Sequence, residues 1–198
     1  MASSLTTRFA YTAAMMGGNV ERKVRVAEVA LRCILCGLGT LAAALVATDK
    51  QTRTFFTMQK TAAFTDVRAL VLLVAANAVA AGYSLLQAAR CLFFFFGSDG
   101  LRSRALAWCV FSGDQALAYV ALGAAAAALQ ASVVSKRGLP AFQWMEVCGL
   151  YGAFCRKAGG GIACAVAGVL AAVALAFISA FNLFRLYGNK KSGGATTW

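Results

Sequence analysis

Four long apolar segments constrain this chain more than any other feature of its sequence. They cover about residues 26–47, 69–96, 105–131 and 162–184. Each holds about 20 residues or more, enough to cross a hydrocarbon core of about 30 Å at a rise of 1.5 Å per residue. Ala and Leu dominate and Pro occurs once, which favours helices over a β-barrel, the other backbone that lipid admits. We therefore predict an all-α membrane protein with a bundle of four transmembrane helices.

The overall composition leads to the same class. Of the 198 residues, 61% are hydrophobic and 13% are charged, against roughly 45–50% and 25% in a soluble domain. The net charge is +12, but the basic residues lie between apolar segments, which indicates membrane lipid as a partner and no nucleic acid. His is absent, and His is the commonest general base and metal ligand. We predict no catalytic residue, no metal site and no cofactor, and therefore not an enzyme.

The predicted membrane domain covers residues 26–187, with short tails at 1–25 and 188–198. Four crossings place both tails on one side of the membrane. Lys and Arg are slightly more frequent on that side, and Arg22, Lys23 and Arg25 directly precede the first apolar segment. Because cytoplasmic segments carry an excess of basic residues, we expect both termini in the cytosol.

Arg32 and Asp114 are charges set inside the first and third apolar segments. A charge at bilayer depth costs roughly 2.5–3.5 kcal/mol, so it normally faces protein and has a partner. Arg32 would lie roughly 9 Å and Asp114 roughly 13 Å from the cytosolic ends of their helices, which allows a salt bridge. Glu28 is a rival partner, four residues before Arg32 on the same helix face. We favour a role in helix packing over a proton or ion relay, because few other buried titratable groups are available.

Polar and small residues inside the apolar segments also indicate contacts between helices. The polar residues Asn77 and Asn182 are expected to hydrogen-bond a neighbouring helix or the backbone. Small residues let helices approach closely in lipid, and the last segment repeats them every four positions at Gly168, Ala172, Ala176 and Ala180. This stripe suits contacts within the bundle or between protomers, and we favour the first because Ala is abundant throughout.

Two cysteines precede the last apolar segment, on the predicted outer side. Cys148 and Cys155 are a candidate disulfide there, because the outside is oxidising. In one continuous helix their Cα atoms would lie about 10 Å apart, beyond the roughly 7 Å that a disulfide allows. Gly149 or Gly152 would have to interrupt the helix. Otherwise the two cysteines pack against the membrane end of the bundle or bond elsewhere.

The same loop carries aromatic residues. The spacing of Trp144, Cys148, Tyr151 and Cys155 is that of one helix face. With Phe154, the two aromatic residues of this stripe form a predicted interaction face of the outer loop. We expect the face to dock on the outer leaflet, where Trp and Tyr favour the interface, or to bind a partner's loop.

The remaining cysteines lie in or near the apolar segments. Cys33 and Cys36 have the spacing of a redox motif, but they lie inside a predicted helix, which favours packing. Cys91 follows Arg90 near the predicted inner end of the second segment. It is a candidate palmitoylation site, with packing as the alternative.

Several stretches are similar to one known family. They are ALRCILC, VATDKQTR, FTDVRALVLLVAANAVAAGYSLLQAARC, FSGDQALAYV, FQWMEVCGLYGAFC and SAFNLFRLYG. The family pattern also has a basic residue in its first helix and an acid in its third, matched here by Arg32 and Asp114. Over about residues 22–188 the chain resembles the Casparian strip membrane domain protein-like (CASP-like) family, second subgroup, within the MARVEL-like four-helix class.

The resemblance implies a multi-pass plasma-membrane protein with cytosolic termini and two outer loops. It implies homo- or hetero-oligomers with other CASP-like proteins, and it supports the disulfide between Cys148 and Cys155. In the founding members the scaffold forms an immobile membrane domain and guides local cell-wall modification, with cell-wall-modifying enzymes as further partners. Those members carry an aromatic-rich motif in the first outer loop, which TDKQTRTFFTMQKTAAFTD does not match. Membrane scaffolding therefore carries over better than lignin guidance.

Two functions follow from these observations. The first is a non-enzymatic scaffold that assembles laterally in the plasma membrane, indicated by the short tails, the missing catalytic constellation and the family pattern. The alternative is a small channel, transporter or transporter subunit, indicated by the charges inside the apolar segments. The alternative requires a polar path that continues across the helix faces from Arg32 and Asp114.

Overall fold

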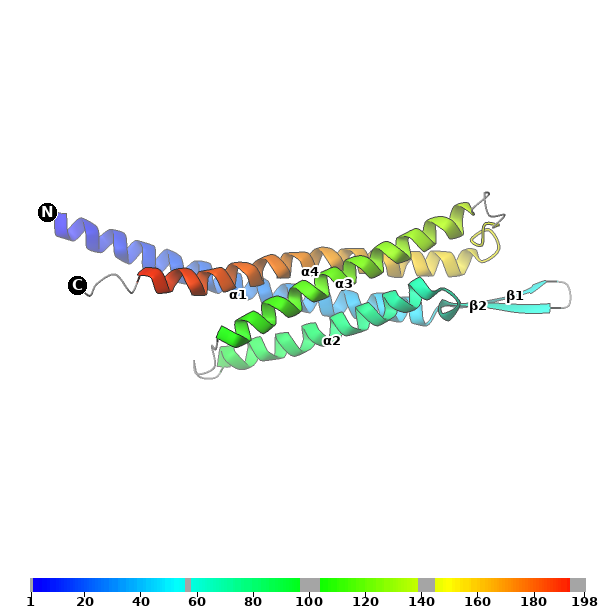
Figure 1. Ribbon diagram of the computed structural model, residues 1–198, viewed down its shortest axis with the longest axis horizontal. Helices are drawn as coiled ribbons and strands as arrows, with labels where there is room; N and C mark the ends of the chain where they lie inside the picture. Colours follow the sequence, from blue (N-terminus) through cyan, green and yellow to red (C-terminus); the bar gives the residue numbers. More distant parts are fainter. Residues whose placement is uncertain (1, 56–57, 97–103, 139–144, 193–198) are drawn as a thin grey trace.

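The computed structural model describes residues 2–55, 58–96, 104–138 and 145–192. Its elements, in chain order, are α1 (Ala2–Ala47), β1 (Lys50–Phe55), β2 (Met58–Ala63), the 3₁₀ turn η1 (Phe64–Asp66), α2 (Arg68–Phe96), α3 (Arg104–Arg137) and α4 (Gly152–Ser192). The helices form one elongated bundle (Figure 1). The first turns of α1 and the last turns of α4 lie at one end of this bundle, and the two strands lie at the other.

Four helices are long and apolar enough to cross a membrane, over Arg22–Ala47, Arg68–Phe93, Ala105–Arg137 and Gly152–Phe184. They confirm the predicted class of an all-α membrane protein with a four-helix bundle. Two helices start earlier than the apolar segments suggested, since α1 begins at Ala2 and α4 at Gly152. Apolarity marks only the part of a helix that suits lipid, whereas the hydrogen-bonded backbone continues through the polar residues on either side.

The helices follow one another around the bundle. Helix α1 packs against α2 and α4, and α3 packs against the same two helices. Helices α1 and α3 therefore lie diagonally opposite each other. The interior is rich in alanine, as at Ala42, Ala124 and Ala128, while large side chains such as Leu86 and Phe177 are exposed. This distribution is typical of lipid, where close packing of small residues holds helices together and apolar side chains face the hydrocarbon.

Glycine brings α1 and α4 into close contact. A Cβ atom placed on Gly161 would lie 2.5 Å from Val46 Cγ2 and 3.3 Å from the Ala42 carbonyl oxygen. A side chain at position 161 would therefore force Val46 or the facing backbone of α1 to shift. Further along α4, the small residues of the predicted stripe also face the bundle, and Ala172 and Ala176 are buried. The stripe therefore serves contacts within the bundle.

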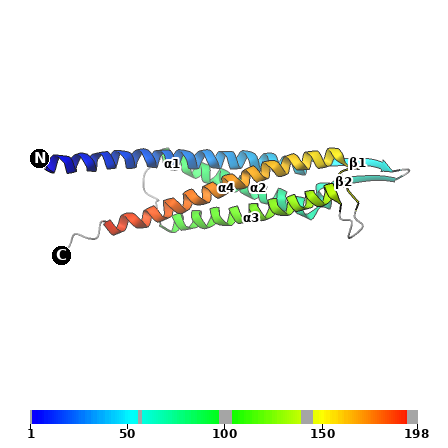
Figure 2. The same cartoon turned by 90° about the horizontal axis from the view of Figure 1, so that it is seen from above.

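A two-stranded antiparallel hairpin, which we did not predict, connects α1 to η1. The register pairs Lys50 with Ala63 and Phe55 with Met58. Alternating Thr residues favour this pairing, and the hydroxyls of Thr52 and Thr61 lie 3.0 Å apart across the strands. Figures 1 and 2 show the hairpin continuing away from the helix ends along the long axis of the bundle.

Candidate functional site

The most polar site in the bundle interior is centred on Arg32 of α1. Its side chain is fully buried, and Asp114 of α3 is 2% exposed. Arg32 Nη1 donates to Asp114 Oδ1 at 3.2 Å and Nη2 donates to Asp114 Oδ2 at 3.1 Å. A guanidinium fork matches the two oxygens of a carboxylate in this geometry. The structure thus brings together the two charges that the sequence placed at similar depths.

Glu28 binds the same guanidinium from one turn earlier on α1. Arg32 Nη2 donates to Glu28 Oε1 at 2.9 Å and Nε donates to the same oxygen at 3.3 Å. The Glu28 side chain is 14% exposed, against 2% for Asp114. The two partners that the sequence left as rivals both hold Arg32, because a guanidinium has five N–H donors. One cation therefore lies between two carboxyl groups.

Helix α4 adds two donors to this cluster. Ser179 Oγ donates to Asp114 Oδ2, and Asn182 Nδ2 donates to Glu28 Oε2 at 3.5 Å. Asn182 thus bonds a neighbouring helix, whereas Asn77 Nδ2 donates to the Leu73 carbonyl of its own helix at 2.8 Å. Ser179 was missed from the sequence, because a helical serine can equally bond its own backbone. The one indication in the sequence was its position about one turn before Asn182, which places both polar side chains on the same face of α4.

Tyr83 places α2 against the same site. Its hydroxyl donates to the Val110 carbonyl of α3 at 3.4 Å. A Cβ atom on Gly113, next to Asp114, would lie 2.6 Å from that hydroxyl oxygen. The tyrosine therefore occupies the space that a side chain at 113 would fill, and all four helices converge near the ion cluster. Within the described ranges, no group of three His, Cys, Asp or Glu side chains is arranged to hold a metal ion.

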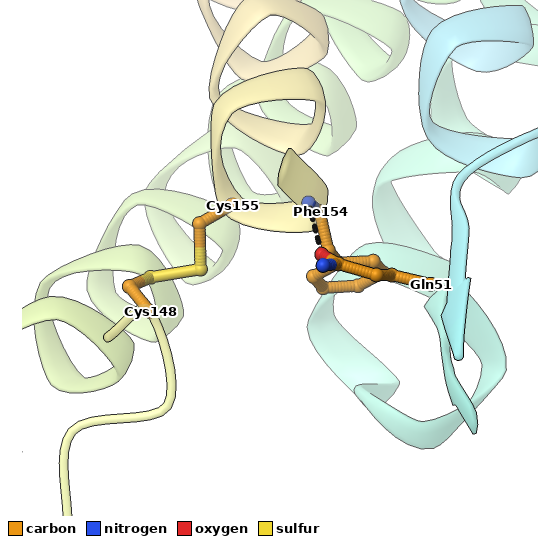
Figure 3. The surroundings of a disulfide bond; sticks show 4 residues. All are labelled: Gln51, Cys148, Phe154 and Cys155. Atoms are coloured by element: carbon orange, nitrogen blue, oxygen red, sulfur yellow. Dashed lines mark hydrogen bonds between the residues drawn. A yellow bond between two sulfur atoms is a disulfide. The ribbon is translucent and has the colours of Figure 1, made fainter. Parts of the chain in front are cut away.

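The second predicted feature lies where the chain enters α4. Cys148 and Cys155 form a disulfide with their Cα atoms 5.6 Å apart (Figure 3). The backbone between them turns, with Leu150 N and Tyr151 N both bonding the Val147 carbonyl, and α4 starts only at Gly152. The cysteines are therefore not on one continuous helix, which corrects the single helix face predicted for 144–155.

The predicted aromatic interaction face also needs correction. Tyr151 and Phe154 are each 7% exposed and belong to the apolar core at this end of the bundle. The turn before α4 directs both rings inward, because the helix that would have presented them outward does not start until Gly152. Trp144, the third member of the predicted face, lies outside the described residues.

The base of the hairpin is attached to the same region. Gln51 Oε1 accepts a hydrogen bond from Phe154 N at 2.9 Å (Figure 3). Lys157 Nζ donates to the Thr48 carbonyl oxygen at 3.2 Å. A side chain from β1 thus satisfies a backbone N–H of the first turn of α4, which otherwise lacks an intrahelical acceptor. The base of the hairpin and the start of α4 are thus joined.

The other cysteines carry free thiols. Cys91 is half-buried near the end of α2, and Cys33 is exposed on α1 while Cys36 is half-buried. Palmitoylation of Cys91 stays a prediction. Both residues of the pair on α1 lie within that helix. Cys33 is exposed and does not pack inside the bundle, so the packing predicted for the pair stays a prediction for Cys36 alone.

Comparison with known proteins identifies the family. The Casparian strip membrane protein domain matches residues 21–181. The chain is 68% identical over 184 residues to CASP-like protein 2U1 of Sorghum bicolor, covering 90% of this chain and 94% of the relative. It is 61% identical over 192 residues to CASP-like protein 2B1 of Oryza sativa subsp. japonica, covering 93% and 96%.

A more distant relative, CASP-like protein 2B2 of Arabidopsis thaliana, is 49% identical over 179 residues, covering 90% of this chain and 89% of the relative. No solved structure matches the chain. The domain match spans all four apolar helices, and the high identities extend over nearly the full length. The chain therefore belongs to the Casparian strip membrane protein family, in the second subgroup of its CASP-like members.

Proposed function

We propose that this protein is a non-enzymatic scaffold of the plasma membrane that associates with itself or with other CASP-like proteins to organise a membrane domain. The observation that carries the proposal is that the charged groups inside the bundle are paired with one another. Arg32 is bound by Asp114 and Glu28, and α4 donates to both acids. Such mutual pairing suits a rigid building block, because the charges inside the bundle serve one another and not a moving ion.

The topology of the proposal follows from the disulfide. Disulfides persist in oxidising compartments and are rare in the cytosol. The Cys148–Cys155 bond lies at the hairpin end of the bundle, opposite the start of α1 and the end of α4. This supports an outer position for the hairpin and a cytosolic position for both termini, in agreement with the basic residues before the first span.

Helix α1 offers a surface for self-association. A row of small exposed residues runs along it at alternating spacings of three and four, flanked by exposed Ile34 and Leu41; the row is Ala30, Cys33, Gly37, Thr40 and Ala44. A Cβ atom on Gly37 would meet nothing within 4 Å. Small residues on an outer face allow a second helix to approach closely. Together with the family membership, this face supports lateral assembly through α1.

The proposal is tested by assembly and lateral diffusion in plant plasma membrane. The tagged protein should crosslink to itself or to CASP-like relatives, and its fluorescence should recover slowly after bleaching. Gly37→Leu should weaken crosslinking between copies, since the new side chain separates the helices. Gly82→Leu is the matched control, because Gly82 of α2 is equally exposed with nothing within 4 Å. Rapid diffusion of the parent protein as a monomer would contradict the scaffold.

Guidance of local cell-wall modification is a further part of the proposal. It is supported by the family alone, and its test is co-purification of wall-modifying enzymes with the assembled scaffold after crosslinking. Vesicles reconstituted with the protein distinguish the channel or transporter alternative. The scaffold predicts no ion or solute flux through them, and a flux that depends on Asp114 would overturn it.

A further inference from the structure

The hairpin end of the bundle is strongly cationic. Six exposed basic residues lie on β1, at the end of α3 and near the start of α4: Lys50, Arg53, Lys136, Arg137, Arg156 and Lys157. The exposed acids described at this end are Asp66, which accepts from Ala63 N at 2.9 Å, and Glu146. Both salt bridges found among the described residues belong to Arg32. Lys157 lies close enough to the buried Asp49 for its charge to act on that carboxyl. The other five cations form no salt bridge with a carboxylate of the described residues.

Two of these placements are unfavourable within the chain itself. The strand register sets Arg53 directly opposite Lys60, and like charges opposite each other destabilise an antiparallel pair. Arg156 and Lys157 lie near the N-terminal end of α4, where the helix dipole already contributes partial positive charge. The first turn of α4 carries no acidic residue that would offset these charges. An external anion would relieve both arrangements.

Lipid phosphates do not explain the charge on the hairpin. The polar headgroup layer is about 5–7 Å thick on each side of the hydrocarbon core. Arg53 is three residues beyond Lys50, which is about 10 Å at the rise of a strand. Since the hairpin extends along the bundle axis and away from the helix ends (Figures 1 and 2), Arg53 reaches past that layer. An anion that pairs with Arg53 would therefore come from beyond the headgroup layer.

We propose that this surface binds a polysaccharide that carries repeated carboxylate groups. The inference rests on the topology of the proposed function, which places the hairpin outside the cell. Single exposed ion pairs are weak, so spatially separated cations favour a polymer whose many charges bind together at high effective concentration. Between the charges, β1 and β2 expose Thr52, Thr54, Gln59 and Thr61. These hydroxyls and amides can hydrogen-bond sugar hydroxyls.

The test uses the full-length protein in nanodiscs of uncharged phosphatidylcholine, with polygalacturonate as the probe. Binding is measured by biolayer interferometry against salt concentration. The triple variant Arg53→Gln, Lys60→Gln and Arg156→Gln should bind at least about tenfold more weakly. The matched control is Arg22→Gln, Lys23→Gln and Arg25→Gln, which removes the same charge at the opposite end and should leave binding unchanged. Binding of the parent should fall as salt rises, because exposed charges are screened.

Four results would overturn the inference: no binding by the parent, unchanged binding by the hairpin variant, equal loss in the control, or equal binding of fully methyl-esterified polymer. An acidic protein or anionic-lipid vesicle bound in place of the polymer counts against it as well. The same variants are assayed for crosslinking between copies. If the parent protein assembles but does not bind the polymer, this inference is refuted and the proposed scaffold function is not. If the parent protein does not assemble, the proposed scaffold function is refuted.

Discussion

Arg32 and Asp114 are ion-paired across the diagonal of the bundle, between two helices that do not pack side by side. Helices α2 and α4 separate α1 from α3, yet the guanidinium and carboxylate meet at 3.1 and 3.2 Å. The pair therefore adds a constraint that packing alone does not supply, because it fixes the two diagonal helices at one relative height.

The losses of stability caused by removing Arg32 and Asp114 should be less than additive. Arg32→Leu leaves Asp114 buried without its cation, and Asp114→Leu leaves Arg32 with Glu28 as its remaining carboxylate. Breaking a buried pair in this way costs about 3–5 kcal/mol. The double variant should recover about 1–3 kcal/mol of the summed loss, with Glu28 still near the membrane surface. Unfolding in mixed micelles, followed by circular dichroism, measures each free energy. Strictly additive losses would mean that Glu28 alone holds Arg32.

Ser179→Ala should destabilise the bundle by about 1–2 kcal/mol, because Asp114 loses its donor from α4. Ser84→Ala is the matched control. Ser84 of α2 is equally buried, but its hydroxyl has no hydrogen-bond partner within the described chain. Its removal should be neutral or slightly stabilising in the same unfolding assay. Equal effects of the two variants would show that the hydroxyl of Ser179 does not support Asp114.

Two adjacent glycines of α4 should respond in opposite directions to alanine. Gly161→Ala places a methyl group against Val46 and should cost about 1–3 kcal/mol through overpacking. Gly160→Ala meets nothing within 4 Å and should stabilise by roughly 0.5–1 kcal/mol, since alanine is the better helix former. Thermal unfolding in detergent compares the two. A loss at Gly160 as large as that at Gly161 would argue against the close crossing of α1 and α4.

Thiol counting should show one disulfide. Denatured protein that is alkylated before reduction should carry five labels, one for each free cysteine. Reduction should release Cys148 and Cys155 and add two labels in the mass spectrum. Cys148→Ser should also lower stability by about 2.5 kcal/mol, the loop-closure value for a short loop. Seven labels before reduction, in protein isolated from oxidising conditions, would exclude the bond.

Asp49 should make stability fall as pH rises. Burial raises the pKa of its carboxyl above the ordinary 3.8, opposed by the charge of Lys157 and a hydrogen bond from the Ala158 backbone. The folded protein therefore binds this proton more tightly than the unfolded chain. The stabilisation is complete below the ordinary pKa and is lost as pH rises through the raised value. Asp49→Asn should unfold at a higher temperature than the parent at pH 7, with the difference vanishing in acid.

The four helices and the central charges were predictable from sequence for a physical reason. Lipid excludes unpaired polar backbone, so a long apolar segment has essentially one folded form. A charge inside it must find a partner, which limited Arg32 to Asp114 and Glu28. The same reasoning drew attention to Asn182, whose polar side chain is unusual at its position.

The outer segments were not predictable in the same way. Water can hydrogen-bond exposed backbone groups, so the residues after Ala47 are not restricted to a helix in the way that a lipid-embedded segment is. The hairpin register also depends on pairing between residues that are several positions apart in the sequence. Tyr151 had the spacing of a helix face with Cys148 and Cys155, but the chain turns at 147–150 before α4 begins, and Tyr151 and Phe154 are buried. Ser179 was missed because a helical serine can equally bond its own backbone, so its presence in an apolar helix does not require a partner on another helix.

The connection between the hairpin and α1 has a mechanical consequence. Helix α1 runs without a break over 46 residues, about 69 Å at 1.5 Å per residue. Only Thr48 and Asp49 separate its last turn from β1. A pull on the two strands therefore acts along a single helix that is more than twice as long as the hydrocarbon core is thick. Tension applied to the hairpin on one side of the membrane would reach the first turns of α1 at the opposite end of the bundle directly.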